Sequence, residues 1–445
     1  MIILCLYFAL LIALGLFQYK KSQTLDSFSV GDRSISTPGV SFSLAASCIG
    51  GSATIGVVSL AWTRGFPAIW YLGSGAAGLC VLCLFLARRV RETGVRTLPE
   101  MVETFISPRA RTLAAIIIVV AWTAILAAQF SATARIISAM AGLEFNTALW
   151  LGAALIIAYT ALGGQRSVIK SDQWQFGFMG GVLVAVLVCL VQANPAGVRD
   201  IHFELLNPSF TFSTWTYYML IIGGSYVVCP MLFSRLLSAK DEKTAFLGAL
   251  GAIPLLLGVA LVIVFIGLLS RGLLPPDTVP DTVLTQGILS LIPPWLGTAL
   301  LLALLSAVIS SADSCLITAA TVTANDVVKT QSVLWCRGLT LIIGAGALAL
   351  SAGGGSILGF LFAANDVYVS GIVAPVFVAM VGYKKFSLRL SLALGAMVVG
   401  GGLGLTAALT GVKAYSFWGL GISLGLSLLS LVPMGISHQA QCAED

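Results

Sequence analysis

The chain has 445 residues, of which 58% are hydrophobic and only 9% are charged, and its formal net charge is +6. A mean hydropathy of +1.00 excludes an ordinary soluble globule, and repeated apolar stretches of about 20 residues are long enough to cross a bilayer. The positive charges cluster in short loops between these stretches, so the net charge does not indicate nucleic-acid binding.

The first apolar segment, IILCLYFALLIALGLF, has no basic residue before it, and Lys20 and Lys21 follow it. A secretory signal peptide begins with basic residues, so we expect an uncleaved helix with its N-terminus outside. Continuing along the chain, we predict an all-α polytopic membrane protein of about 13 transmembrane helices. These helices are expected to begin near residues 2, 38, 67, 112, 147, 174, 214, 245, 296, 333, 356, 388 and 415.

Most of the 24 Lys and Arg residues fall in loops that this count places inside the cell. Arg235 is assigned to one of these inner loops, together with Lys240 and Lys243. Because basic residues accumulate in cytoplasmic loops, the asymmetry predicts an outer N-terminus, an inner C-terminus and an odd number of spans. We expect the protein to be a multi-pass component of a plasma membrane or a bacterial inner membrane.

Two predicted spans carry helix-weakening residues at membrane depth. One contains SCIGGSATIG, with Gly50 and Gly51, and the other contains IIGGSYVVCP, with Gly223, Gly224 and Pro230. Non-helical backbone at this depth is tolerated only where it lines a cavity or is buried in protein. Close helix packing through small residues is the alternative explanation. Because the breaks fall in corresponding helices of two halves, we favour a transporter built from inverted repeats.

This reasoning divides the chain into five parts. Each inverted repeat has five helices, of which the first is broken. The parts are 1–37 (first helix and inner loop), 38–193 (repeat 1), 194–213 (outer loop), 214–382 (repeat 2) and 383–445 (two peripheral helices and a short inner tail).

The stretch SAVISSADS, residues 306–314, places serines and a carboxylate inside an apolar helix. Carbonyls freed near Ala46 and Ile49 could join these hydroxyls to form a set of hard oxygen ligands for a small cation. Serines that bond back to the preceding helical turn are the alternative, but four serines with an aspartate favour a cation site. The residues that share one helical face, at i, i+3, i+4 and i+7, are Ala307, Ser310, Ser311 and Ser314.

Four stretches in order support a family resemblance: DSFSVGDRSIS, TALGGQRSVIKSDQWQ, PMLFSRLLSAKDEKTA and SAVISSADSCLITAATVTANDVVK. Each is weak alone, but their order and spacing make the joint match specific. From about residue 25 to 380 the chain resembles the sodium/solute symporter family, whose members include sodium-coupled sugar, proline, sialic acid and choline transporters. The resemblance implies a leucine-transporter-like inverted-repeat fold and Na+-coupled symport of a small organic solute by alternating access.

The resemblance also implies two cation sites. A second site on the inner side, present in some relatives, would here use Asp172, Asp313 and Ser314. Two carboxylates there could hold a second Na+, or one could be protonated, and a helix N-cap is an equal alternative for Asp172. The principal Na+ site would use backbone oxygens of Ala46, Ile49 and Ala307 and the hydroxyls of Ser310 and Ser311.

The family places its solute beside the breaks. Choline carriers have a tryptophan at the position of Cys48, so its absence argues against recognition of a quaternary ammonium group. Proline carriers have an aspartate there and sugar carriers an asparagine, and Met231 replaces a family glutamine. The pocket is therefore expected to be less polar than a sugar site, which leaves amino acids, small carboxylates or other compact solutes. The candidate pocket residues are Ser47, Cys48, Gly51, Ser52, Gln129, Tyr226, Met231 and Asp366.

Asp366 has two interpretations, because it could pair with Arg135 or face the solute. A proton-coupled carrier with Asp313 or Asp172 as its proton site is the nearest alternative function. A transporter-like membrane sensor that works with a separate partner is a second alternative. An enzyme is not expected, since the chain has only two histidines and no cluster of acid–base residues. The expected partners are a small solute and the lipid bilayer, with no nucleic acid and no obligate protein partner.

Overall fold

The computed structural model describes residues 33–163, 165–383 and 385–433, with Leu4, 6–9, 12, 13, 16 and 24 before them. Most of the first expected helix, the basic pair Lys20 and Lys21, Lys384 and the C-terminal tail lie outside the described residues. The inner N-terminal loop and the orientation of the C-terminus are therefore left as predictions.

Among the described residues, ten helices are long and apolar enough to cross a membrane. An eleventh span is formed if the pair Thr37–Cys48 and Ser52–Arg64, bent by 65°, is taken as one. The last apolar helix, Ala414–Leu429, is shorter. Each expected span that begins between residues 38 and 388 thus has a counterpart. The ten helices are Phe66–Glu92, Pro108–Ala141, Phe145–Leu162, Ser171–Ala193, Phe212–Leu237, Glu242–Ser270, Pro294–Val328, Val333–Ala352, Ile357–Gly382 and Leu390–Thr410.

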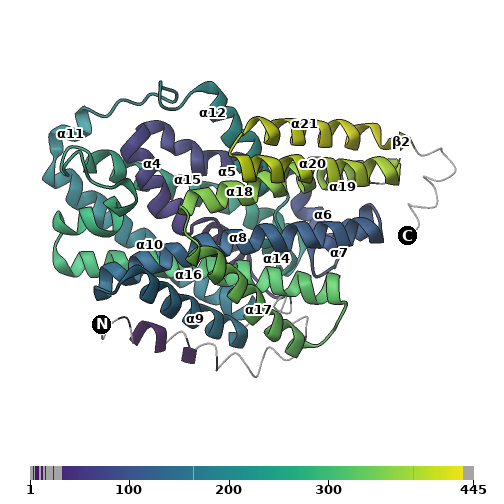
Figure 1. Cartoon of the computed structure of the whole chain (residues 1–445), viewed down its shortest axis with the longest axis horizontal. Helices are drawn as coiled ribbons and strands as arrows, with labels where there is room; N and C mark the ends of the chain where they lie inside the picture. The colour runs from purple at the N-terminus through teal and green to yellow at the C-terminus, as the bar shows by residue number, and fades with distance from the viewer. Residues whose placement is uncertain are drawn as a thin grey trace.

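Several spans contain wider or interrupted turns, so Figure 1 labels their parts separately. The first half contains α3 (Thr37–Cys48), α4 (Val57–Arg64), α5 (Trp70–Val81), α6 (Ala87–Glu92), α7 (Leu98–Phe105), α8 (Pro108–Ala141), α9 (Phe145–Gly163), α10 (Gln165–Ala193) and α11 (Pro195–Arg199). The second half contains α12 (Phe212–Tyr217), α13 (Gly223–Val227), α14 (Pro230–Leu237), α15 (Glu242–Ser270), α16 (Pro294–Val322), α17 (Val333–Ala352), α18 (Ile357–Tyr368) and α19 (Ala374–Gly382). The chain then forms β1 (Phe386–Leu388), α20 (Leu390–Thr410), α21 (Ala414–Leu429) and β2 (Leu431–Pro433), and the two short strands pair antiparallel.

The helix α16 is the core of the molecule. The apolar segment of its span is 94% buried, which is the highest share among the ten long spans. It packs against α8, α10 and α17, and Figure 1 shows it in the middle of the bundle, with α20 and α21 side by side at one edge. Polar groups on a helix buried on all sides are costly unless other helices or a ligand supply their partners.

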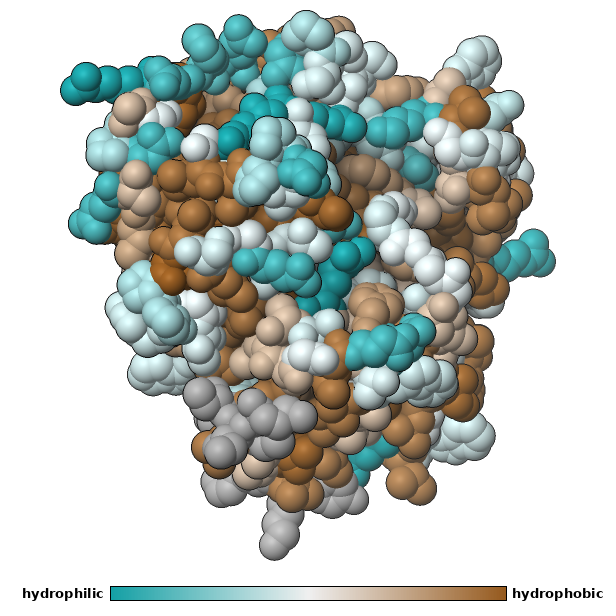
Figure 2. All heavy atoms as spheres, turned by 60° about the vertical axis from the view of Figure 1, so that its left-hand side comes forward, coloured by the Kyte–Doolittle hydropathy of each residue, from teal (hydrophilic) through white to brown (hydrophobic). Residues whose placement is uncertain are grey.

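The outer surface of the bundle is apolar over wide areas, as a lipid-facing surface requires. Figure 2 shows brown apolar residues on both flanks of the face it presents, with hydrophilic residues gathered at the top and through the middle. Large side chains that are exposed include Trp150, Trp174, Leu334 and Leu409. In a soluble protein so much exposed apolar area would cause aggregation, whereas lipid covers it in a membrane.

The first predicted break is confirmed at Gly50 and Gly51. The helix α3 ends at Cys48, Ile49 is extended (φ −114°, ψ 91°) and helical structure resumes at Ser52. A Cβ atom on Gly50 would lie 2.8 Å from Ser311 Oγ, and one on Gly51 would lie 2.3 Å from the Cβ of Ala132. These glycines therefore let α8 and α16 approach the broken backbone.

The second break lies at Val228 and Cys229, which are extended, and helical structure resumes at Pro230. The proline was correctly associated with this break, because it suits the first turn of a helix and lacks the N–H that would continue the preceding one. Gly223 and Gly224, in contrast, are helical residues of α13. For these two glycines, the alternative explanation of close helix packing through small residues applies.

We predict that Gly78→Ala destabilises the fold. A Cβ atom on Gly78 would lie 2.0 Å from the carbonyl oxygen of Gly223, so α5 and α13 would have to separate. Because overpacking costs about 1–3 kcal/mol and backbone cannot move aside as a side chain does, we expect about 3 kcal/mol. Thermal unfolding of the purified protein measures the loss. Gly177→Ala, which would meet nothing within 4 Å, is the control, and equal unfolding temperatures for the two variants would contradict the prediction.

Candidate ion and solute site

A cavity of about 80 Å³ lies between the two breaks. Residues of both broken spans line it, together with side chains from α5, α8, α16 and α18. The predicted solute-site residues that line it are Ser47, Cys48, Ser52, Gln129, Tyr226 and Met231. The structure thus brings most of the predicted set together, although these residues are far apart in the sequence.

Gly51 contributes backbone to the site, but it is not among the lining residues. Its N–H donates to Gln129 Oε1 over 2.9 Å, which satisfies a backbone donor at the start of the second half-helix. Gln129 therefore has two roles, because it lines the cavity and also caps the broken helix. An amide side chain suits both roles, since it offers an acceptor to the backbone and donors to a ligand.

Asp366 does not line the cavity, and it does not pair with Arg135. Its Oδ1 accepts hydrogen bonds from the hydroxyls of Tyr217, at 2.8 Å, and Ser416, at 2.7 Å. Arg135 lies 3.5 Å from Asp281 instead. Neither interpretation offered for Asp366 matches this geometry, because its carboxylate joins α12 and α21 to α18.

The cavity has further lining residues that sequence reasoning missed. Tyr71, Trp122 and Asn365 come from unbroken helices, where nothing in the sequence marks them. Cys229 lies at the second break, directly before Pro230, and that position was a usable signal. The remaining polar or sulfur-containing residues missed are Ser225 and Cys315.

None of the lining residues carries a charge. The walls consist of aromatic rings, thiols, hydroxyls, amides and aliphatic groups, and the Sγ of Cys315 contacts the Sδ of Met231 at 3.5 Å. A charged ligand group in this cavity must therefore be stabilised by backbone dipoles or by a co-bound ion.

Ser311 supplies an unpaired oxygen beside the first break. Its side chain is 3% exposed, and its Oγ has no hydrogen-bond partner among the described residues. A buried hydroxyl without a partner costs about 1–3 kcal/mol. Since it faces the backbone at Gly50, close to the end of α3, a small cation bound between them would satisfy it. The orphaned oxygen thus fits the cation site predicted from Ala46, Ile49 and Ala307.

Ser310 directs its hydroxyl hydrogen to Asp172 Oδ1. A hydroxyl that donates its hydrogen keeps two lone pairs as acceptors, so Ser310 remains able to coordinate a cation. This hydrogen bond connects the predicted cation site to the carboxylate of Asp172 on α10.

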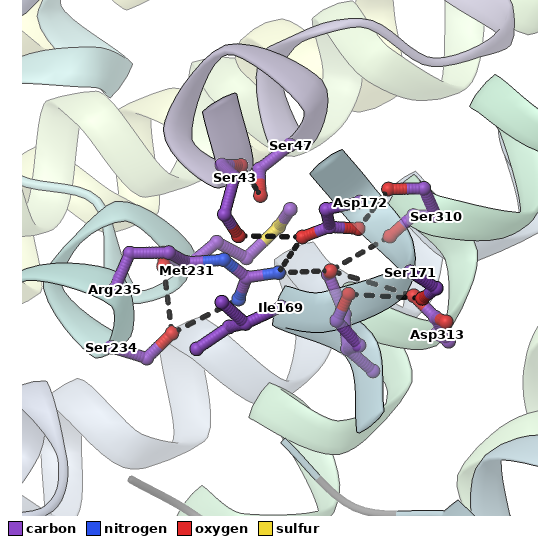
Figure 3. A network of polar contacts seen from close by, with 12 residues as sticks. Ser43, Ser47, Ile169, Ser171, Asp172, Met231, Ser234, Arg235, Ser310 and Asp313 are labelled. Atoms are coloured by element: carbon purple, nitrogen blue, oxygen red, sulfur yellow. Dashed lines mark hydrogen bonds and ion pairs between the residues drawn. The ribbon is translucent and has the colours of Figure 1, made fainter. Parts of the chain in front are cut away.

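Asp172 is at the centre of a buried polar cluster. Figure 3 shows it between Ser43, Ser310 and the guanidinium of Arg235. The Ser43 hydroxyl donates to its Oδ2 over 2.6 Å, and Nη2 of Arg235 lies 3.4 Å from the same oxygen. The side chains of Asp172 and Arg235 are both completely buried. Asp172 lies about two turns inside α10, which begins at Gln165, so the helix N-cap alternative is wrong.

Ser314 and Asp313 extend the same cluster along α16. Nη2 of Arg235 also donates to the Ser314 hydroxyl, and that hydroxyl lies 3.5 Å from Asp313 Oδ1. The predicted association of Asp172, Asp313 and Ser314 is therefore present in the structure. The cluster contains two carboxylates and one guanidinium, so it has one negative charge in excess when both acids are ionised.

The assignment of Arg235 to an inner loop is wrong. Arg235 is 1% exposed and lies within α14. Positive residues near the ends of apolar stretches are normally loop residues, and only the approach of α10 and α16 provides the buried anions that this guanidinium requires.

Not every serine of residues 306–314 belongs to the site. Ser306 accepts a hydrogen bond from the Tyr7 hydroxyl at 2.9 Å and donates to the carbonyl oxygen of Leu302. Ser314 donates back to the carbonyl oxygen of Ser310 at 2.7 Å. The back-bonding alternative therefore holds for Ser306 and Ser314, whereas the hydroxyls of Ser310 and Ser311, the two predicted for the principal Na+ site, do not bond back to the preceding turn.

Known proteins are similar in sequence to most of this chain. Residues 28–333 match the profile of the sodium:solute symporter family. The chain is 25% identical to the sodium/pantothenate symporter of Escherichia coli, over 96% of this chain and 94% of that protein. It is 26% identical to the sodium/proline symporter 2 of Staphylococcus saprophyticus, over 74% of this chain and 68% of that protein.

Solved structures share the fold. A Na+-coupled sialic acid symporter in a substrate-bound outward-open state matches with a TM-score of 0.79 at 15% identity, over 96% of this chain and 98% of that chain. A nucleobase-cation-symport-1 family transporter in a closed conformation matches with a TM-score of 0.60 at 15% identity, over 93% of this chain and 95% of that chain.

We predict that Arg235→Met destabilises the protein by about 3–5 kcal/mol, because it leaves buried carboxylates without their cation. A double variant that combines Arg235→Met with Asp313→Asn should recover part of this loss of stability, since it removes one of the two negative charges. Lowering the pH should also reduce the loss by protonating the carboxylates. Thermal unfolding across pH measures all three effects. Arg109→Met changes an exposed arginine and is the control. A pH-independent loss would contradict the electrostatic explanation.

Proposed function

This chain belongs to the sodium:solute symporter family, and we propose that its Na+ and its solute bind together between the two broken helices. The protein is a multi-pass cell-membrane transporter that couples solute movement to Na+, and it is not an enzyme. The observation that carries the proposal is the unpaired hydroxyl of Ser311, which faces the backbone at the first break.

The proposed principal Na+ site consists of backbone oxygens of Ala46, Ile49 and Ala307 with the hydroxyls of Ser310 and Ser311. Backbone carbonyls at an unwound helix are suitable Na+ ligands in inverted-repeat transporters. The site contains only neutral oxygens, so Na+ would bring in a positive charge that the end of α3 and nearby Asp172 stabilise. Ion binding would then tie the first broken helix to α16.

The proposed architecture has two inverted repeats, residues 38–193 and 214–382, within about 13 helices, with the N-terminus outside and the C-terminus inside. The two breaks support this arrangement, because each falls in the first helix of its half. Alternating access would then move one set of helices against the other around the cavity.

The proposed solute is a compact organic carboxylate, such as an amino acid or a small organic acid. The second half-helix α14 begins at Pro230, beside lining residues Cys229 and Met231. The start of a helix is the positive end of its dipole, which attracts an anionic group. Pantothenate and proline, named for two relatives, both carry a carboxylate, which agrees with this class.

We also propose that Asp172, Asp313 and Ser314 bind a second cation. The excess negative charge of the cluster supports the proposal, because an uncompensated buried carboxylate would be costly. Arg235 supplies one positive charge from the protein, so a single Na+ would complete the balance. The alternative is a proton on Asp313, which would remove the same excess negative charge.

A stability screen tests the proposed solute class. Ligand binding raises the unfolding temperature by mass action, so the purified protein can be tested against carboxylates, amines and sugars with and without Na+. We expect carboxylates to stabilise the protein only when Na+ is present, and choline to have no effect. The stabilising compounds are then tested for uptake driven by a Na+ gradient in proteoliposomes. Stabilisation by sugars or amines alone would contradict the proposal.

We predict that Ser311→Ala weakens Na+ binding about tenfold or more, since a lost hydrogen-bonding or ligand oxygen is worth about 1–3 kcal/mol. Without Na+ the variant should be at least as stable as the parent, because the hydroxyl has no partner to lose. Replacing Ser310 as well should abolish Na+ dependence. Na+-dependent unfolding temperature and uptake measure these effects. Ser306→Ala is the control, and an unchanged Na+ response in the double variant would exclude the site.

We predict that Asp313→Asn lowers the Na+ Hill coefficient or abolishes uptake, and that high Na+ partly restores transport. A protonation role gives a different result, because the amide resembles the neutral acid and would remove pH dependence while the Na+ response survives. Uptake measured against Na+ at several pH values separates the two. Asp277→Asn, at an exposed position, is the control. Parental Na+ and pH profiles in Asp313→Asn would show that the residue is structural.

A further inference from the structure

A groove of about 450 Å³ shares no lining residue with the ion and solute cavity. Its walls are the end of the Phe66–Glu92 span, the first turns of α15 and the end of α19. Leu84 and Phe85 line it and are 69% and 51% exposed. Exposed apolar residues within a membrane span contact lipid chains, so the groove opens toward the bilayer.

Two arginines stand at the end of this groove. Arg88 and Arg89 follow Leu84 by about one helical turn, or roughly 6 Å along the axis. The two arginines therefore lie near the end of the apolar span, which is the level where lipid headgroups are expected. Glu92 is a further lining residue, so these three side chains together carry one net positive charge.

The two arginines are held toward the groove by separate contacts. The guanidinium carbon of Arg88 lies 4.7 Å from the centre of the Phe246 ring, and Nη1 of Arg89 donates to the carbonyl oxygen of Met380. A guanidinium stacked on a ring still presents the N–H groups of its edge. Arg88 makes no hydrogen bond or ion pair with another described side chain, so those donors are available.

We propose that this groove binds one anionic glycerophospholipid. Its phosphodiester would accept hydrogen bonds from Arg88 and Arg89, and an acyl chain would lie over Leu84 and Phe85. Basic pockets between transmembrane helices suit anionic headgroups. The carboxylate of Glu92 would repel a headgroup with several negative charges. The net charge of +1 on the groove therefore matches a single phosphodiester. The bound lipid would link the end of α6 to α15 and α19.

Native mass spectrometry of the full chain tests the proposal with phosphatidylglycerol, phosphatidylcholine and free glycerophosphate. We expect preferential binding of phosphatidylglycerol, and Arg88→Gln should weaken it about fivefold, the effect of one basic residue at a membrane surface. Arg109→Gln, which removes an exposed arginine outside the groove, should leave it unchanged. Unfolding temperatures in phosphatidylcholine verify that both variants fold.

Three results would overturn the proposal. The first is equal phosphatidylglycerol binding by the Arg88→Gln variant and the parent, and the second is equal binding of the two lipids. The third is saturation by glycerophosphate alone, which would identify a site for free anions. These readouts require no transport, so they are independent of the proposed ion and solute site.

Discussion

The structure depends on one constraint, which is that backbone groups at membrane depth must find partners inside the protein. Two spans interrupt their own helical hydrogen bonding, and neighbouring helices supply part of what they lose. Gln129 accepts from the N–H of Gly51, and the Tyr368 hydroxyl donates to the carbonyl oxygen of Val228 over 2.7 Å. Since unsatisfied groups in hydrocarbon cost several kcal/mol each, these partners fix how α8 and α18 pack against the breaks.

The same constraint explains why the proposed Na+ site lies at the break. Ser311 keeps an unpaired oxygen beside Gly50, while Ser310, directly before it in the chain, donates to Asp172. One hydroxyl is thereby shared between the proposed Na+ site and the carboxylate cluster. A change in charge at Asp172 would alter how Ser310 is oriented, so the two proposed cation sites would be coupled through this hydroxyl.

Recognition of the solute differs from recognition in a pocket with charged side chains. The cavity walls carry no charge, and the charged residues Asp172, Asp313 and Arg235 form a separate buried cluster. In the proposed binding mode, a carboxylate in the cavity depends on the helix dipole of α14 and on co-bound Na+. Such an arrangement would make ion binding and solute binding mutually favourable, which is the thermodynamic requirement for coupling.

The sequence alone determined the membrane class, the positions of the spans that begin between residues 38 and 388, and the two breaks, because hydropathy and helix-breaking residues act locally. It also identified the serine face of α16, since spacing fixes which residues share a side of a helix. Only the tertiary structure decided that Arg235 is buried, that Gly223 serves packing, and that Asp366 bonds to Tyr217. Those outcomes depend on which distant helices meet, and the periodicity of one segment does not specify the partners that another segment brings to it.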